Sequence, residues 1–214
     1  MKLYSYFRSS AAYRVRIALS LKGQTYEYAA KHLLKDGGQQ RQAEYLAINP
    51  QGLVPALEHE GALLTQSLAI IEYLDEQFPT PPLLPKRSVD RAVVRAMAML
   101  VACDVHPLNN LRVLNFLRDK LGQSSDAIGI WYQHWIAEGF TALEQLLASH
   151  STSARYCFGD AVSLADVLLV PQVANSRRYR MDLSPYPTLR DITSHLESLP
   201  QFIAARPEAQ PDAE

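Results

Sequence analysis

The chain has 214 residues, 48% of them hydrophobic and 20% charged, which is the balance of a globular protein able to bury a core. With 21 basic and 22 acidic residues its formal net charge is −1, so no overall field attracts nucleic acid or an anionic membrane surface, and neither is expected as a partner. The sequence shows no membrane-spanning apolar run, no signal-peptide core and no metal-type spacing of its 2 cysteines, so we expect a cytoplasmic protein without a bound metal.

The first predicted elements are a strand and a helix joined by a serine turn. Tyr4–Phe7 is aromatic and extended, and an apolar helical face follows within Val15–Leu19. Ser9 and Ser10 precede this face as N-cap candidates, because a hydroxyl accepts from the free N–H groups of the first helical turn. A helix start also carries roughly +0.5 of a charge. With Arg8 beside it, the turn is a candidate anion site, and simple helix capping is the alternative.

The rest of the first domain alternates strands and helices. The pattern predicts a strand at Tyr26–Ala29, a helix through Ala43 and Leu46, strands at Val54–Glu58 and Leu63–Thr65, and a helix from Ser67 that stops before Pro79. This βαβαββα order implies a parallel strand pair followed by an antiparallel hairpin, with helices covering the sheet. Prolines within Thr80–Pro85 mark a boundary. We therefore expect an α/β domain over 1–82.

Beyond this boundary the predicted elements are all helices. Helical spacing predicts helices from Ser88 to Pro107, Asn109 to Leu121, Ile128 to Leu147 and Leu189 to Ala205, and another that begins at a capping box in Ser163–Asp166. Cys103 is expected to be a buried small apolar residue. The polar tail Ala209–Glu214 is expected to be loosely held. The sequence therefore predicts an all-helical second domain over 88–214.

Several motifs, in their order and spacing, resemble one known family. The run Arg8-Ser9-Ser10 before the first helix is similar to the Ser-Ser-Cys-x-x-Arg signature of zeta-class glutathione transferases, a class that contains maleylacetoacetate and maleylpyruvate isomerases. Further matching segments are Lys35–Gln40, Leu53–Leu57, Gln66–Leu74, Val170–Asn175, Asp182–Pro187 and Gln210–Asp212. The resemblance covers essentially the whole chain. It implies a thioredoxin-like N-terminal domain, an all-α C-terminal domain, glutathione as cofactor, and a homodimer.

One signature residue departs from the family, since Ala11 stands where the family usually has Cys. No thiol from this position can take part, so the nucleophilic sulfur must come from glutathione. Glutathione reacts as its thiolate, and a free thiol has a pKa of about 8.5. A helix start and hydroxyl donors lower that pKa. The resemblance implies this task for Ser9, with Ser10 as the alternative.

The resemblance also implies contacts to the rest of glutathione. The implied residues are Gln40, Val54, Pro55, Gln66, Ser67, His106 and Asn110. A cis peptide between Val54 and Pro55 would aim the backbone of Val54 at the cysteinyl part. Gln66 and Ser67, at a helix start, would bind the γ-glutamyl carboxylate, and Ser67 would also cap that helix. Gln40 would contact the glycyl end. His106 could lie near the substrate, and Asn110 could bind glutathione or a carboxylate.

The implied substrate is a small diacid, which needs cations to hold it. The resemblance implies that Arg8, Arg112 and Arg178 converge on it, with Arg177 as the alternative to Arg178. Arginine suits this task because its planar fork binds a carboxylate through two hydrogen bonds and keeps its charge. Arg8 would also stabilise charge that develops on the substrate, which makes it catalytic together with Ser9 and Ser10.

The implied reaction is the glutathione-dependent cis–trans isomerisation of maleylacetoacetate to fumarylacetoacetate, a step of tyrosine and phenylalanine breakdown. Reversible thiolate addition would turn the double bond into a single bond, and rotation and loss of the sulfur would follow. Isomerisation of maleylpyruvate in gentisate breakdown is the alternative. Two further readings are glutathione conjugation or dehalogenation by the same thiolate, and a non-catalytic binding module.

Overall fold

The computed structural model describes residues 1–214, which divide into two compact units. One unit is Met1–Pro82 together with Ser198–Glu214. The other is Leu83–Glu197. The first unit contains the only sheet, and the second is built from helices. None of the helices combines the length and the apolar content that a membrane span requires.

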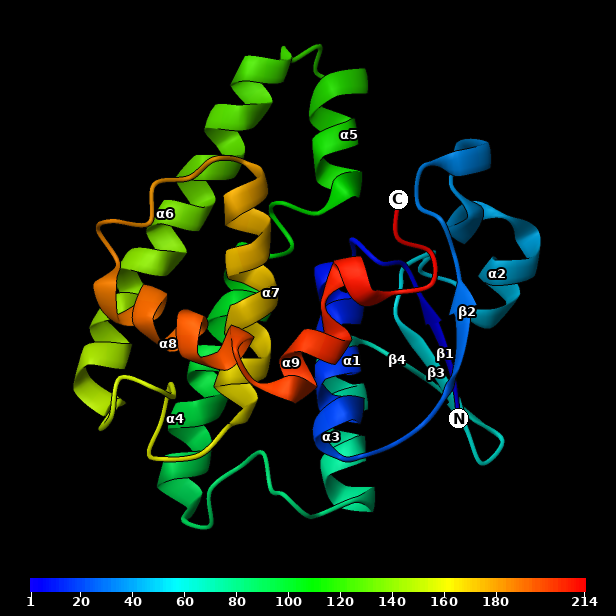
Figure 1. Ribbon diagram of the computed structural model, residues 1–214. Helices are drawn as coiled ribbons and strands as arrows, with labels where there is room; N and C mark the ends of the chain where they lie inside the picture. Colours follow the sequence, from blue (N-terminus) through cyan, green and yellow to red (C-terminus); the bar gives the residue numbers. More distant parts are fainter. The chain divides into compact units, whose positions relative to one another are not determined.

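The C-terminal end of the chain differs from the expected division. The sequence placed all of 88–214 in the helical domain, whereas Ser198–Glu214 belongs to the first unit. The expected helix Leu189–Ala205 is in fact two helices, α8 (Pro187–Glu197) and α9 (Pro200–Ala205). The chain breaks there because Pro200 has no N–H to continue a helix and suits a first helical position. Helix α9 then packs against the first helix of the chain (Figure 1).

The sheet of the first unit has the predicted topology. Its strands are β1 (Lys2–Ser5), β2 (Glu27–Ala30), β3 (Ala56–His59) and β4 (Ala62–Thr65). They lie in the order β2-β1-β3-β4, with β1 parallel to β2 and antiparallel to β3, and β3 antiparallel to β4. The helices of this part are α1 (Ser10–Leu21), α2 (Ala43–Ile48) and α3 (Ser67–Gln77). Two short 3₁₀ turns, Lys35–Gly37 and Gln39–Arg41, precede α2. The expected βαβαββα order is confirmed.

A hydrophobic cluster fixes the start of the chain. It contains Tyr4, Tyr6, Phe7, Tyr45, Val54 and Ala56, all nearly buried. Tyr6 and Phe7 meet edge to face with ring centroids 4.9 Å apart, and Tyr4 meets Tyr45 at 5.8 Å. Such pairs stabilise a core beyond the apolar area that they bury. The serine turn thus leaves directly from a packed core.

The second unit contains five α-helices and one π-helical segment. These are α4 (Ser88–Met99), the π-helical segment Leu100–Val105, α5 (Leu111–Asp119), α6 (Ser125–His150), α7 (Leu164–Arg178) and α8 (Pro187–Glu197). Helix α4 packs against α7, and α6 packs against α8 (Figure 1). The all-helical character predicted for this region is confirmed.

The start of α7 is held by the predicted capping box. The carboxylate of Asp166 accepts from the backbone N–H and the hydroxyl of Ser163, both at 2.7 Å, and from the backbone N–H of Cys157 at 2.8 Å. Asp166 is fully buried, so these donors replace the water that the carboxylate loses. The expectation that Cys103 is buried is wrong, because Cys103 is exposed on the π-helical segment, whereas Cys157 is buried.

Candidate active site

The serine turn starts α1 with an available hydroxyl. Ser9 is the N-cap residue, with φ −71° and ψ 115°, and its Oγ accepts from the backbone N–H of Ala12 at 3.2 Å. Its own hydroxyl proton is not committed to another protein group, so it can be donated to a ligand. Ser10 is the first helical residue and is buried. This geometry favours Ser9 over Ser10 as the hydroxyl that faces a ligand at the helix start.

The peptide groups before Ser9 are held by a buried arginine. Arg16, in α1, donates to the carbonyl oxygen of Tyr6 at 3.3 Å and to that of Phe7 at 3.0 Å. It also donates to Oγ of Ser5 at 3.1 Å, and its side chain is nearly fully buried. The exposed Arg8 lies with its guanidinium 4.9 Å from the centroid of the Phe7 ring. Arg16 is therefore a structural residue, and it fixes the segment that carries Arg8.

A second helix start belongs to the same unit. Gln66 is the N-cap of α3, with φ +69°, a conformation that a residue other than glycine adopts only under constraint. Its side-chain amide donates to Oε1 of Gln51 at 2.8 Å. The expectation that Ser67 caps the helix is wrong, because Ser67 is its first residue and its Oγ accepts from Nη1 of Arg14 at 3.3 Å. The arginine links α1 to the first turn of α3.

The first unit also has the expected cis peptide between Val54 and Pro55. The carbonyl oxygen just before it, on Leu53, accepts from the hydroxyl of Tyr45 and from the side-chain amide of Asn49, both at 2.7 Å. Neither Tyr45 nor Asn49 was singled out from the sequence. The Asn49–Gly52 turn was the available signal for the second of them, because Asn side chains commonly bond the backbone of their own turn.

Gln40 is buried rather than displayed at the surface. Its Nε2 donates to the carbonyl oxygen of Leu33 at 3.3 Å, and its Oε1 has no hydrogen-bond partner. Gly38 makes room for this side chain, since a Cβ at Gly38 would lie 2.8 Å from Nε2 of Gln40. A buried amide oxygen without a donor is uncommon and identifies an acceptor that a ligand N–H could satisfy.

In the second unit, Asn110 and Arg112 share one helix start. Asn110 is the N-cap of α5, and its Oδ1 accepts from the backbone N–H of Arg112 at 3.1 Å. Arg112 itself is exposed. His106 directly follows the π-helical segment and donates its backbone N–H to the carbonyl of Val101 at 2.9 Å. Asn110 thus has the structural role of a cap, and a ligand contact by it or by His106 stays a prediction.

The two adjacent arginines at the end of α7 differ in their surroundings. Nη1 of Arg177 lies 2.5 Å from a carboxylate oxygen of Glu197. Arg178 has no such carboxylate partner, and it directly precedes Tyr179, whose ring stacks on that of Tyr132 with centroids 3.5 Å apart. Burial raises the pKa of both tyrosines, and the charge of Arg178 opposes this rise. Arg178 is therefore the more available of the two for an anion.

The first unit therefore defines a thioredoxin-like protein, and its helix starts are a candidate site for an anionic thiol. Two helix starts, at Ser9 and at Ser67, favour negative charge through their helix dipoles, and Arg14 of α1 donates to Ser67 of α3. The residues present fit glutathione, because Ser9 has a free hydroxyl proton and Gln40 a free buried acceptor. No group of three or more His, Cys, Asp or Glu side chains is arranged to hold a metal ion.

Comparison with known proteins places this chain in a family. Residues 3–82 match the family model "Glutathione S-transferase, N-terminal domain". A probable maleylacetoacetate isomerase of Vibrio cholerae is 51% identical, with 99% of this chain and 97% of the relative covered. A maleylpyruvate isomerase of Ralstonia sp is 49% identical over the whole of both chains. The chain belongs to the glutathione transferase family, in its zeta class.

Solved structures agree with the whole fold. A holo maleylpyruvate isomerase described as a zeta-class bacterial glutathione transferase superposes with a TM-score of 0.97 at 48% identity, and both chains are fully covered. A maleylacetoacetate isomerase of Methylobacterium extorquens AM1, with bound malonate and glutathione, gives 0.94 at 40% identity over both full chains. One from Anaeromyxobacter dehalogenans, with bound dicarboxyethyl glutathione and citrate, gives 0.87 at 43% identity and covers 100% of this chain and 97% of that one.

Proposed function

We propose that this protein isomerises maleylacetoacetate to fumarylacetoacetate with glutathione as cofactor. The observation that carries the proposal is the helix start at Ser9, with a hydroxyl proton available and Arg8 in the same turn, in a chain about half identical to named isomerases. Bound glutathione supplies a thiolate that adds reversibly to a conjugated double bond and is regenerated. The relative that holds dicarboxyethyl glutathione supports this chemistry, because its ligand combines glutathione with a group that carries two carboxylates.

Within the first unit, each residue has a defined task in the proposal. Ser9 donates its hydroxyl proton to the thiolate, and the start of α1 adds its dipole, so the pKa of the thiol falls. Ser67 and the free N–H groups of α3 bind the γ-glutamyl carboxylate, with Gln66 beside them. Val54 and Pro55 pair with the cysteinyl backbone. Gln40 accepts through its unpaired Oε1.

Three arginines hold and polarise the diacid in the proposal. Arg8, Arg112 and Arg178 are exposed, and none is paired with a carboxylate in the way that Arg177 is paired with Glu197. Holding a diacid at both carboxylates orients its double bond. Arg8, next to Ser9, stabilises charge that develops on the substrate oxygen. His106 and Asn110 are proposed to contact the substrate and glutathione.

Maleylpyruvate remains the alternative substrate, because both diacids present carboxylates to the same arginines and both names occur among close relatives. We further propose a homodimer in the cytoplasm. The family resemblance supports the dimer, and an exposed thiol at Cys103 supports a reducing compartment. Light scattering of the purified protein measures the oligomeric state.

One experiment separates the proposal from its rivals. The purified protein is mixed with a maleyl substrate and a sub-stoichiometric amount of glutathione, and the ultraviolet absorbance of the substrate is followed. Turnover beyond the amount of glutathione supports an isomerase, and the ratio of rates on the two maleyl acids identifies the substrate. Consumption of glutathione in proportion to product indicates a conjugating or dehalogenating enzyme. Failure to bind glutathione leaves only a non-catalytic module.

A further inference from the structure

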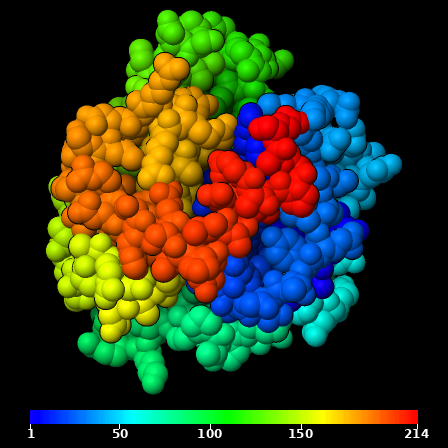
Figure 2. Space-filling model, viewed as in Figure 1, coloured from blue at the N-terminus to red at the C-terminus, as the bar shows by residue number.

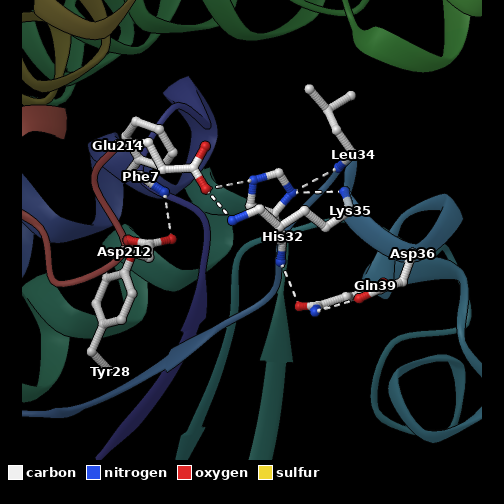
Figure 3. Close-up of polar contacts among 9 residues, drawn as sticks. All are labelled: Phe7, Tyr28, His32, Leu34, Lys35, Asp36, Gln39, Asp212 and Glu214. Carbon is white, nitrogen blue, oxygen red and sulfur yellow. Dashed lines mark hydrogen bonds and ion pairs between the residues drawn. The ribbon is translucent and has the colours of Figure 1, made fainter.

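The last residues of the chain are bonded to the segment that carries Arg8 and Ser9. One carboxylate oxygen of Asp212 accepts from the backbone N–H of Phe7 at 3.1 Å, and the other accepts from the hydroxyl of Tyr28 at 2.6 Å (Figure 3). Figure 2 shows the C-terminal residues, in red, lying at the surface against the N-terminal part, in blue. The tail was expected to be loosely held, and these bonds correct that expectation.

The peptide unit at Phe7 is therefore held from two sides. Asp212 binds its N–H, and the buried guanidinium of Arg16 binds its carbonyl at 3.0 Å. The next turn bond, from the N–H of Ser9 to the carbonyl of Tyr6 at 2.9 Å, completes the segment. The ring of Phe7 also lies beneath the guanidinium of Arg8. A shift of Phe7 would therefore move the guanidinium of Arg8 and the hydroxyl of Ser9, the two groups that the proposed function uses.

Asp212 is itself fixed by its neighbours. The side-chain amide of Gln210 donates to the carbonyls of Ala204 at 3.0 Å and Arg206 at 2.9 Å, which fastens the tail to the end of α9. Arg16 reaches the same end of α9 through its bond to the carbonyl of Ala205 at 3.0 Å. Tyr28, which belongs to strand β2, fixes the orientation of the Asp212 carboxylate through its hydroxyl. Burial and the bond to Asp212 raise the pKa of Tyr28, so its hydroxyl stays a donor at neutral pH.

We infer that Asp212 is a positioning residue, which holds Phe7 so that Arg8 and the hydroxyl of Ser9 face the reacting groups. This inference rests on the proposed function of Arg8 and Ser9. Asp212 acts through Phe7, and it is not a catalytic residue itself. The resulting site is complete only when the C-terminal segment is in place.

Glu214 provides a matched control two residues further on. Its carboxylate pairs with Nζ of Lys35 and lies 3.6 Å from Nε2 of His32, and it does not bond to Phe7 (Figure 3). Glu214 is exposed, and ion pairs at exposed positions contribute little to stability. Glu214→Ala therefore loosens the tip of the tail without releasing the peptide of Phe7.

The test compares four variants of the full chain: Asp212→Ala, Asp212→Asn, Tyr28→Phe and Glu214→Ala. Asn keeps an oxygen for Phe7 and can turn its NH₂ toward the hydroxyl of Tyr28, so it retains the hydrogen bonds without the charge. The readouts are kcat and KM for the maleyl substrate, KM for glutathione, the melting temperature, and the pKa of bound glutathione from its thiolate absorbance.

Asp212→Ala is expected to lower kcat by about 10- to 100-fold, the scale for a misplaced catalytic group, and to raise the pKa of the bound thiol. Tyr28→Phe should give a smaller change of the same kind, and Asp212→Asn and Glu214→Ala should stay within about threefold of the parent. The inference is overturned if Asp212→Ala leaves kcat and the thiol pKa unchanged, or if Glu214→Ala causes an equal loss. Absence of turnover in the parent protein would instead refute the proposed function, and the thiol pKa would still test Asp212.

Discussion

Arg14 and Ser67 are 53 positions apart, yet Nη1 of Arg14 donates to Oγ of Ser67 at 3.3 Å inside the first unit. Both side chains are buried. The bond joins the body of α1 to the first residue of α3, so the two helix starts that favour anions are held in one arrangement. A ligand with a thiolate and a carboxylate at a fixed separation requires such an arrangement.

Removing this bond should weaken glutathione binding more than it slows turnover. Ser67→Ala removes one hydrogen bond of the buried Arg14 guanidinium, and bonds to charged groups contribute about 1.5–3 kcal/mol. It also removes a hydroxyl proposed to bind the γ-glutamyl carboxylate. We expect a rise of about tenfold or more in KM for glutathione with kcat within a few-fold of the parent. Ser88→Ala is the matched control, because Ser88 is also the first residue of its helix but is exposed. Equal effects of both variants would contradict the role of Ser67.

Ser9→Ala should separate capping from catalysis. Loss of the bond from Ser9 to the N–H of Ala12 lowers the stability by about 0.5–2 kcal/mol, the usual cost of an N-cap, which leaves the fold intact. Loss of a hydrogen bond to the charged thiolate should lower kcat by about 10- to 100-fold and raise the pKa of the bound thiol. Stopped-flow titration against pH measures that pKa. An unchanged pKa in Ser9→Ala with a raised one in Ser10→Ala would assign the thiolate contact to Ser10.

The order of elements could be predicted from the sequence because its signals are local. Alternation, helical spacing, capping residues and turn residues each act within a few positions, and they predicted the βαβαββα unit, the capping box at Asp166 and the turn at Ser9. The contacts that hold the site are not local. Arg16 binds Ala205 across 189 positions, and Asp212 binds Phe7 across 205, and no periodicity encodes such pairs.

Predictions from the sequence were also wrong at single positions, where one residue type can have either of two structural roles. Serine is a common N-cap residue, but Gln66 occupies the N-cap position of α3. The hydroxyl of Ser67 instead accepts a hydrogen bond from the buried Arg14. Cys103 was expected to be buried because free cysteine is usually a small buried residue, but it is exposed on the π-helical segment. These outcomes depend on backbone geometry that the sequence pattern does not show.

The two arginines at the end of α7 should have separable effects. Arg178→Ala is expected to raise KM for the maleyl diacid by about tenfold or more, because a charge-assisted pair with a substrate carboxylate is lost, with little change in KM for glutathione. Arg177→Ala removes an exposed ion pair with Glu197 and should change KM for the diacid by less than about threefold. Steady-state kinetics with each substrate varied in turn provide the comparison. A larger rise in KM for the diacid in Arg177→Ala than in Arg178→Ala would show that Arg177 is the residue that binds the substrate carboxylate.

The two thiols should react at very different rates. Cys103 is exposed and should be modified quickly by a thiol reagent in the native protein, whereas Cys157 is buried and should react only after unfolding. Burial raises the pKa of Cys157, chiefly by desolvation and then through the charge of Asp166. The unfolded thiol ionises at a lower pH than the folded one, so this residue reduces stability as the pH rises through about 8.5. Cys157→Ala removes this destabilising contribution. The free energy of unfolding, measured by denaturant titration at neutral and alkaline pH, should therefore depend less on pH in Cys157→Ala than in Cys103→Ala.

Gly38 and Gly37 offer a paired test of the role of Gln40. Both have a positive φ, +96° and +74°, so alanine at either position is strained by about 1–2 kcal/mol. Only at Gly38 would a Cβ also meet Gln40, at 2.8 Å from Nε2, whereas nothing lies within 4 Å of a Cβ at Gly37. Gly38→Ala must therefore displace the side chain of Gln40, and we expect KM for glutathione to rise beyond the rise in Gly37→Ala, with both melting temperatures lowered. If the two variants bind glutathione equally, Gln40 is not a ligand and its burial against Leu33 is its only role, a result that Gln40→Ala with unchanged KM would reproduce.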